Sequence, residues 1–269
     1  MAVSRALTIA GSDSGGGAGI QADLKTFQEL GVFGMTAITA VTAQNTLGVQ
    51  GVYPLTVEAL STQIDSIATD LHPHAVKTGM LFNAEMIHLV AEKVKQYSFQ
   101  HLVVDPVMVA KGGQSLLQDE AVEALITSLL PLATVITPNI PEAEVLTGME
   151  IKTLHQRKEA AKKLGDLGAN HVIIKGGHDE SSSIVVDLLF DGENFEEFKG
   201  QRRETKHTHG TGCTFAAAIT AELSKGYTVV QAVQTAKTFI QAAIDDQIGI
   251  GQGHGPTNHW AYNKKHSVK

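Results

Sequence analysis

Short apolar runs alternate with segments of helical periodicity along almost the whole chain, and this alternation limits the possible folds more than any other feature. Apolar, β-branched strands are predicted at 5–11, 35–42, 49–54, 75–80, 102–106, 134–138 and 171–178, with a hairpin over 184–198 around Asp191-Gly192. Helices are predicted at 20–30, 56–71, 83–96, 119–130 and 153–167, in a short segment closed by Gly148, after residue 210 and from Val229. We therefore predict an α/β protein, with a mainly parallel central sheet and helices on both faces.

Composition limits the domain count and the class of partner. The 269 residues are 43% hydrophobic, and no linker, repeat or low-complexity run divides them, so we predict one domain over 1–269. The net charge of −7 argues against a nucleic-acid or membrane partner, because both favour a basic surface. No run approaches the roughly 18 apolar residues of a membrane span. A single cysteine excludes an intramolecular disulfide, so a cytoplasmic location is expected, with small molecules as partners.

A glycine-bordered segment precedes one of the predicted helices. Gly210 and Gly212 allow tight turns, and the helix that follows directs free N–H groups and the positive end of its dipole at the loop. This arrangement predicts an anion site. It also places Cys213, the only cysteine, at a helix N-terminus, where we expect a lowered thiol pKa. The alternative is that Cys213 is inert packing.

Three further features have both a functional and a structural interpretation. The loop 12–19 is rich in glycine but matches neither common nucleotide-binding spacing, so it is a ligand-covering loop or a plain turn. Asp23 is a substrate contact or an ordinary acidic residue in the first turn of a helix. Lys237, inside an apolar stripe, extends from the edge of the core or faces an anion.

The pairs His72/His74 and His207/His209 lack distal partners at zinc-site spacing, so we discount zinc.

Polar residues follow several predicted strands. Asp105 ends one strand, Asn139 and Glu142 follow the next, and Lys175 lies in a third. Ligands bind at the carboxyl ends of strands in open α/β sheets, so these residues are predicted to converge, although a turn aspartate is the alternative for Asp105. Carboxylates are suitable Mg²⁺ ligands, whereas Asn139 and Lys175 are donors to phosphate. The set predicts phosphoryl transfer.

The motifs together resemble those of a known family. They are Gly11–Asp23, Asp105–Met108, Thr137–Glu142, Lys175–His178 and Thr208–Cys213. In register over nearly the whole chain, they are similar to the ribokinase superfamily, and specifically to its hydroxymethylpyrimidine/phosphomethylpyrimidine kinases of thiamine biosynthesis. Sugar kinases of the wider superfamily have an aspartate base where this chain has Cys213. The resemblance implies a ribokinase-like three-layer α/β/α fold.

The resemblance also implies roles for individual residues. It implies an ATP site near Asn139, Lys175, Thr211, Gly212 and Lys237, an Mg²⁺ region near Asp105 and Glu142, and a pyrimidine pocket near Gly11, Asp23, Gln44, Met80, Val107 and Cys213. Cys213 would be the base, with Lys175 and the Gly210 and Gly212 loop binding the transferred group. The reaction implied is ATP-dependent phosphorylation of 4-amino-5-hydroxymethyl-2-methylpyrimidine, and then of its monophosphate.

Other functions stay open at this point. A pyridoxine or pyridoxal kinase has the same scaffold and a similar loop, a non-catalytic nucleotide or vitamin sensor would keep the pocket, and the thiol could serve redox control. Gln44 favours the pyrimidine, because one amide can meet a ring nitrogen and an adjacent amine, a pair that pyridoxal lacks. The alternative for Gln44 is an exposed turn residue. We expect a homo-oligomer, in the form of a dimer, although the sequence itself does not determine the oligomeric state.

Overall fold

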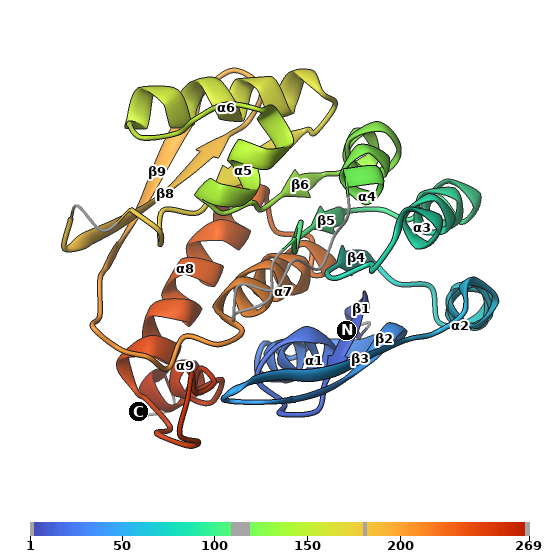
Figure 1. Cartoon of the computed structure of the whole chain (residues 1–269), viewed down its shortest axis with the longest axis horizontal. Helices are drawn as coiled ribbons and strands as arrows, with labels where there is room; N and C mark the ends of the chain where they lie inside the picture. Colours follow the sequence, from blue (N-terminus) through green and yellow to red (C-terminus); the bar gives the residue numbers. More distant parts are fainter. Residues whose placement is uncertain (1–2, 109–118, 180–181, 267–269) are drawn as a thin grey trace.

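The computed structural model describes residues 3–108, 119–179 and 182–266 (Figure 1). Its strands are β1 (Arg5–Asp13), β2 (Phe33–Asn45), β3 (Gly48–Pro54), β4 (Ala75–Thr78), β5 (Leu102–Val104), β6 (Val135–Ile136), β7 (His171–Ile174), β8 (Ile184–Phe190) and β9 (Phe195–Gln201). Its α-helices are α1 (Gly19–Glu29), α2 (Val57–Asp70), α3 (Ala84–Gln96), α4 (Asp119–Ala124), α5 (Ile140–Thr147), α6 (Leu154–Asp166), α7 (Thr211–Ser224), α8 (Val229–Asp245) and α9 (Ala261–His266).

The strands form one sheet in the order β3-β2-β1-β4-β5-β6-β7-β8-β9. The six strands from β2 to β7 in this order are parallel, whereas β3 pairs antiparallel with β2, and β8 and β9 continue antiparallel from β7. The hairpin between β8 and β9 turns where predicted, because the Asp191 carboxylate accepts the N–H groups of Glu193 and Asn194. The mainly parallel α/β sheet is therefore confirmed.

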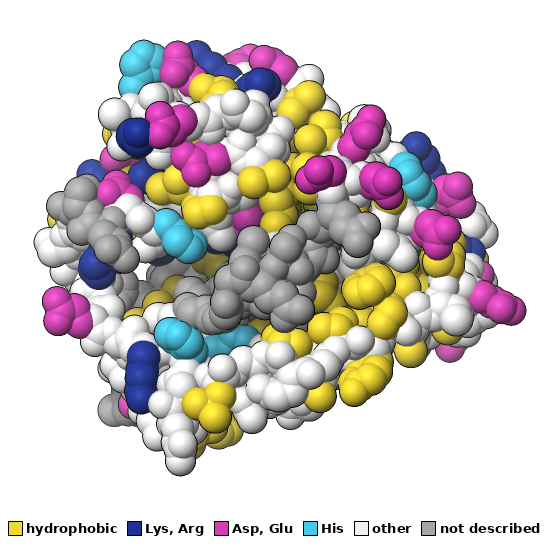
Figure 2. All heavy atoms as spheres, viewed as in Figure 1, with side chains coloured by type: hydrophobic (Ala, Val, Ile, Leu, Met, Phe, Trp, Pro, Cys, Tyr) yellow, Lys and Arg dark blue, Asp and Glu magenta, His cyan; other side chains and the backbone are white. Residues whose placement is uncertain are grey.

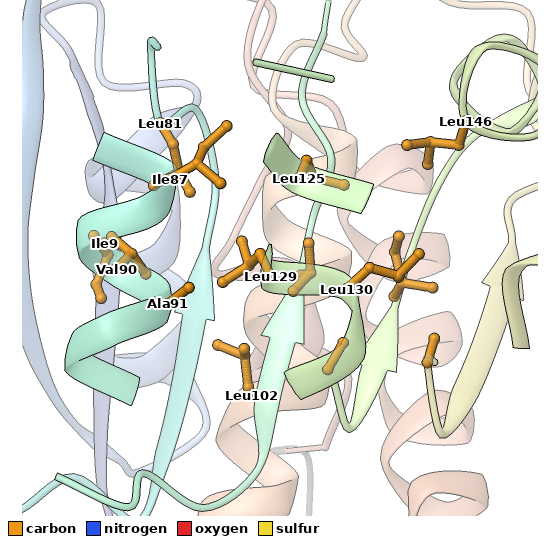
Figure 3. Packing of buried hydrophobic residues seen from close by; sticks show 14 of the residues in the cluster. Ile9, Leu81, Ile87, Val90, Ala91, Leu102, Leu125, Leu129, Leu130 and Leu146 are labelled. Carbon is orange, nitrogen blue, oxygen red and sulfur yellow. The ribbon is translucent and has the colours of Figure 1, made fainter. Parts of the chain in front are cut away.

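Two apolar clusters cover the two faces of the sheet. Neighbouring residues of each strand point to opposite faces, so Leu7 packs in one cluster and Ala6 in the other. The first cluster includes side chains from α2, α3, α4 and α6, and the second from α1, α7 and α8 (Figure 1). Figure 3 shows part of the first cluster, in which Ile87 and Val90 of α3 lie beside Leu129 of the next helical segment. This arrangement gives the predicted three layers.

Side-chain caps determine where several helices begin. Asn83 accepts the N–H of Met86 at the start of α3, as its sequence position predicts. Asn139 and Glu142 form a reciprocal capping box at the start of α5, in which each side chain accepts the other's backbone N–H. Gly148 ends α5 with a φ of 66°, a conformation that favours glycine. The α5 capping box contains two predicted site residues.

Several elements differ from the sequence prediction. The helix predicted over 119–130 is α4 followed by a π-helical turn at Leu125–Leu129 and a 3₁₀ turn at Leu130–Leu132. Pro131 has no N–H to continue an α-helix, and the buried leucines of this segment still reach the core (Figure 3). The central strands β5 and β6 are shorter than predicted, and α9 was not predicted. In the described part of the chain, every helix is too short or too polar to cross a membrane.

Candidate active site

A cavity of about 670 Å³ lies at the carboxyl edge of the parallel strands, the position expected for an α/β sheet. Met80, Asp105, Asn139 and Lys175 follow β4, β5, β6 and β7 within a few residues, and all four line the cavity. Nearly all of the predicted site residues line the same cavity, namely Gly11, Gln44, Met80, Asp105, Val107, Asn139, Glu142, Lys175, Gly210, Thr211, Gly212, Cys213 and Lys237. Asp23 is the exception among the predicted residues.

In the view of Figure 2, charged side chains are spread over the outer helices, whereas hydrophobic side chains gather along the β2–β3 side of this face. Histidine side chains lie near the middle of the same face. Inside the cavity, the wall is likewise divided. Val49, Val52 and Met80 contribute apolar surface, and Val49 is the strand partner of Gln44. Lys175 with Glu142 and Asp105 forms a charged region. The cavity therefore suits a ligand with an apolar ring and a charged group.

Two glycine-containing loops meet closely at the cavity. Gly210 begins α7 with a φ of 80°, and a Cβ added to it would overlap the carbonyl oxygen of Gly17. On the facing loop, Asp13 accepts N–H groups from Gly15, Gly17 and Ala18. Burial opposes ionisation of Asp13, but hydrogen bonds from His209 and these amides outweigh it and lower the pKa of the carboxyl. Glycine at 210 is thus required for close approach of two backbones.

Lys175 lies between two buried carboxylates at the charged end of the cavity. Its ammonium is 3.1 Å from Asp105 Oδ1 and 3.9 Å from Glu142 Oε2. Asp105 also accepts a hydrogen bond from the Thr137 hydroxyl. A Cβ added to Gly212 would lie 3.3 Å from the ammonium, so the start of α7 is next to this cluster. The predicted convergence of Asp105, Glu142 and Lys175 is present.

Glu142 is expected to make stability depend on pH. Burial raises its pKa to about 7, and Asp105 adds to the increase while Lys175 opposes it. Between the ordinary value near 4.5 and about 7, the folded state binds more protons than the unfolded state, so the free energy of unfolding falls as pH rises. The full effect is up to about 3 kcal/mol at 1.36 kcal/mol per pKa unit.

Glu142→Gln provides the test, because glutamine can keep the capping box at Asn139 but does not titrate. In urea unfolding at about pH 5 and about pH 7.5, we expect the variant to gain stability relative to the wild type at the higher pH. Parallel pH dependence in the two proteins would show that the Glu142 pKa is not raised.

The carboxylates of Asp105 and Glu142 fit an Mg²⁺ ion that is shared with phosphate oxygens. Mg²⁺ is commonly bound by one or two protein carboxylates together with substrate phosphates and water. Among the described residues there is no group of three or more acidic, histidine or cysteine side chains that could hold a metal alone. The two carboxylates close to one ammonium form a partial donor set, which a phosphate would complete.

The structure corrects the predicted acidity of Cys213. Burial raises the pKa of its thiol to about 11. The Lys77 ammonium and the N–H of Gly19 act in the opposite direction, whereas the carboxylates of Asp23 and Asp105 add to the increase. The sequence argument considered only the helix N-terminus, which lowers a thiol pKa. Burial and two neighbouring carboxylates, neither visible from local sequence, outweigh it.

Asp23 is not among the residues that line the cavity, and its predicted contact with substrate stays a prediction. Its side chain is fully buried, and Oδ2 accepts hydrogen bonds from Thr8 at 2.6 Å and from Lys77 at 2.9 Å. Lys77 is the member of the pair that lines the cavity. Although burial opposes the charge, the carboxylates of Asp23 and Asp105 raise the Lys77 pKa. A lysine inside the apolar strand 75–78 was the available sequence signal for this residue.

Lys237 lines the cavity, but its charge already has a protein partner. Its ammonium is 2.7 Å from Asp187 Oδ2, and Asp187 Oδ1 accepts the N–H of Gly176. Neither sequence interpretation included this ion pair. The pair joins α8 to β8 at one end of the cavity, and a nucleotide phosphate would have to share the lysine with Asp187.

Gln44 occupies the other end of the cavity, at the end of β2. Its amide oxygen Oε1 lies 3.2 Å from the hydroxyl of Thr42, and its amide nitrogen Nε2 lies 3.2 Å from Nε2 of His209. It is half-buried, so the interpretation as an exposed turn residue is wrong. His209 and Asp13 are residues that the sequence reasoning did not assign to the site, although both lie in the motifs that it singled out.

Comparisons with known proteins agree with this site. A family model described as phosphomethylpyrimidine kinase matches residues 13–258. A hydroxymethylpyrimidine/phosphomethylpyrimidine kinase from Bacillus subtilis (strain 168) is 61% identical over 264 residues, covering 98% of this chain and 97% of that protein.

Solved structures give the same picture. An ADP complex of Bacillus subtilis pyridoxal kinase has a TM-score of 0.91 and 45% identity, covering 98% of this chain and all of that one (100%). A phosphomethylpyrimidine kinase from Clostridium difficile 630 has a TM-score of 0.80 and 45% identity, covering 89% and 99% of the two chains. The resemblance inferred from the motifs is confirmed, and with it the three-layer fold and the assignment as a kinase. The chain belongs to the phosphomethylpyrimidine kinase family.

Proposed function

We propose that this enzyme transfers the γ-phosphoryl group of ATP to the hydroxymethyl oxygen of 4-amino-5-hydroxymethyl-2-methylpyrimidine, and then phosphorylates the monophosphate to the diphosphate for thiamine biosynthesis. The observation that carries the proposal is the combination of Gln44 with the Lys175 cluster in one cavity. The amide of Gln44 suits the edge of an aminopyrimidine, and the cluster suits phosphate. The relatives named for this activity support the same function.

The residues of the site have separate roles in this proposal. Lys175 offsets phosphate charge, and the first N–H groups of α7 at Gly212 and Cys213 bind the group in transfer, because the first turn of a helix has free donors. In its thiolate form, Cys213 takes the proton of the substrate hydroxyl. Because burial raises the pKa of the thiol to about 11, the thiolate is the minor form near neutral pH, so the thiol first loses its own proton to solvent. The apolar residues Met80 and Val107 enclose the ring.

Mg²⁺ bound with ATP phosphates would neutralise charge on them, and Asp105 with Glu142 would hold it. We expect Asp105→Asn to raise the Mg²⁺ concentration needed for half-maximal rate and to lower turnover, because one anionic oxygen donor is lost. Asparagine keeps the shape and can still accept from Thr137. The measurement is ADP formation against Mg²⁺ concentration at saturating ATP. Unchanged Mg²⁺ dependence and turnover would exclude Asp105 from this role.

Gln44→Met tests the choice of substrate. Loss of a bidentate contact is expected to raise the activation free energy for the pyrimidine by about 1–3 kcal/mol, which lowers kcat/KM roughly 5- to 150-fold. Pyridoxal lacks the matching pair of groups, so any activity on pyridoxal should fall much less or improve. Measuring kcat/KM for both substrates in both proteins provides the comparison. Equal losses for the two substrates would mean that Gln44 does not read the pyrimidine edge.

Pyridoxal kinase is the second candidate, because solved structures with that name match the chain at TM-scores of 0.91. A non-catalytic sensor would bind ligand without forming ADP, so turnover itself separates it from both kinases. The cytoplasmic location and the dimer stay predictions.

A further inference from the structure

One ring nitrogen of His209 lies between two other side chains. His209 Nε2 is 2.8 Å from Asp13 Oδ2 and 3.2 Å from the amide nitrogen of Gln44. The three residues come from β1, β2 and the loop before α7, and positions 13 and 209 are 196 residues apart. This contact joins the glycine-rich loop, the predicted substrate-reading residue and the anion loop.

The protonation of this nitrogen follows from its partner. The pKa of Asp13 is lowered, so the carboxyl is ionised at neutral pH and can only accept hydrogen bonds. A lone pair on Nε2 would face an anion at 2.8 Å, which is repulsive. His209 Nε2 therefore carries hydrogen and donates it to Asp13, in either charge state of the ring.

The orientation of the Gln44 amide follows in turn. An N–H group of Gln44 would face a ring nitrogen that itself carries hydrogen, whereas a half-turn of the amide places its oxygen there. The amide nitrogen then faces Thr42 Oγ1, whose own hydrogen is donated to the carbonyl of Ser12 at 2.8 Å. The single hydrogen of His209 Nε2 is then shared between Asp13 Oδ2 at 2.8 Å and the Gln44 amide oxygen in a three-centre hydrogen bond, and the Gln44 amide nitrogen has an acceptor in Thr42 Oγ1.

The ring of His209 is held firmly in place. Its backbone N–H donates to Gly255 O at 3.1 Å, and its carbonyl accepts from Thr257 N at 3.3 Å. A Cβ added to Gly17 would lie 2.5 Å from His209 Cδ2, so the facing loop packs directly against the ring. The donor that faces Gln44 is therefore fixed by the fold.

We propose that the Asp13–His209 pair determines specificity by fixing which way the Gln44 amide faces. One lone pair of the Gln44 amide oxygen and one hydrogen of the Gln44 amide nitrogen are left for the ligand, and their positions relative to each other are fixed. This order matches an exocyclic amine next to a ring nitrogen. The inference rests on the proposed function, and it makes His209 a positioning residue that acts through Gln44.

The test is a double-mutant cycle on the ratio of kcat/KM for the aminopyrimidine to kcat/KM for pyridoxal. His209→Phe keeps a ring of similar size and removes the donor, whereas His209→Gln places an amide N–H near the lost Nε2. We expect the ratio to fall roughly tenfold in His209→Phe, the effect of about one hydrogen bond left unmade, and to be largely restored in His209→Gln. In a Gln44→Met background, His209→Phe should change the ratio by less than about twofold.

The outcomes separate the inference from the proposed function. If both substrates lose the same factor in His209→Phe, or if the effects of positions 44 and 209 are independent, His209 has only a structural role and the inference is wrong. If the wild type forms no ADP with the aminopyrimidine, the proposed function fails before the ratio can be taken. A wild type active on the pyrimidine with an unchanged ratio in His209→Phe contradicts the inference alone.

Discussion

Replacing Cys213 by alanine is expected to lower kcat by roughly 10²–10⁴-fold, the usual contribution of general-base catalysis. KM for the pyrimidine should change little, because Gln44 and the apolar wall at Met80 stay in place. Steady-state kinetics with both substrates varied measure the effect.

The raised thiol pKa adds a second expected result. The thiolate is the species that reacts with iodoacetamide, and with a pKa of about 11 its fraction rises about tenfold per pH unit across the neutral range. Alkylation of Cys213 should therefore be slow at neutral pH, accelerate with pH, and be slowed by bound substrate. An alanine variant with near-full turnover would assign Cys213 to packing.

Gly210→Ala is expected to lower kcat/KM by at least about 10²-fold, the order of loss expected when reacting groups are misplaced by about 1 Å. The added Cβ would overlap the carbonyl oxygen of Gly17, which belongs to backbone and cannot turn away. The loop before α7 must then move, and with it the N–H groups of Gly212 and Cys213.

Gly226→Ala is the matched control. Gly226 has a φ of 88°, similar to the 80° of Gly210, but a Cβ added there meets no atom within 4 Å, and the residue lies beyond the other end of α7. Both variants carry the cost of a left-handed alanine, roughly 1–2 kcal/mol of stability. Gly226→Ala should keep wild-type kinetics. Similar kinetics in the two variants, with both folded, would mean that the close approach at Gly210 does not matter for catalysis.

Much of the site was predictable because it follows general rules for the ends of parallel strands and for the starts of helices. Asp105 and Lys175 were expected at one edge of the sheet because parallel strands end there, and they are 3.1 Å apart although 70 residues separate them. The strand and helix pattern predicted the layers because side-chain periodicity follows burial. The helix from residue 211 was predicted from its glycines, and Gly210 does adopt a positive φ.

What the sequence could not predict depends on long-range contacts. The pKa of Cys213 is determined by burial and by carboxylates from α1 and from the end of β5, so a rule about helix ends alone gave the wrong direction. The ion pair of Asp23 with Lys77 was not predicted, because the two residues are 54 positions apart in the sequence. The Asp13–His209 contact likewise joins two distant motifs, which sequence spacing does not relate.

The central claim is that this cavity selects and phosphorylates an aminopyrimidine. The most direct measurement is a competition, in which the enzyme receives ATP, Mg²⁺ and equal concentrations of 4-amino-5-hydroxymethyl-2-methylpyrimidine and pyridoxal. The early ratio of the two phosphorylated products, measured by mass spectrometry against standards, equals the ratio of the two kcat/KM values. We predict that the pyrimidine phosphate predominates by at least about tenfold, and that the diphosphate follows it, because pyridoxal leaves the amide of Gln44 unpaired. An excess of pyridoxal phosphate would contradict this account and identify a pyridoxal kinase.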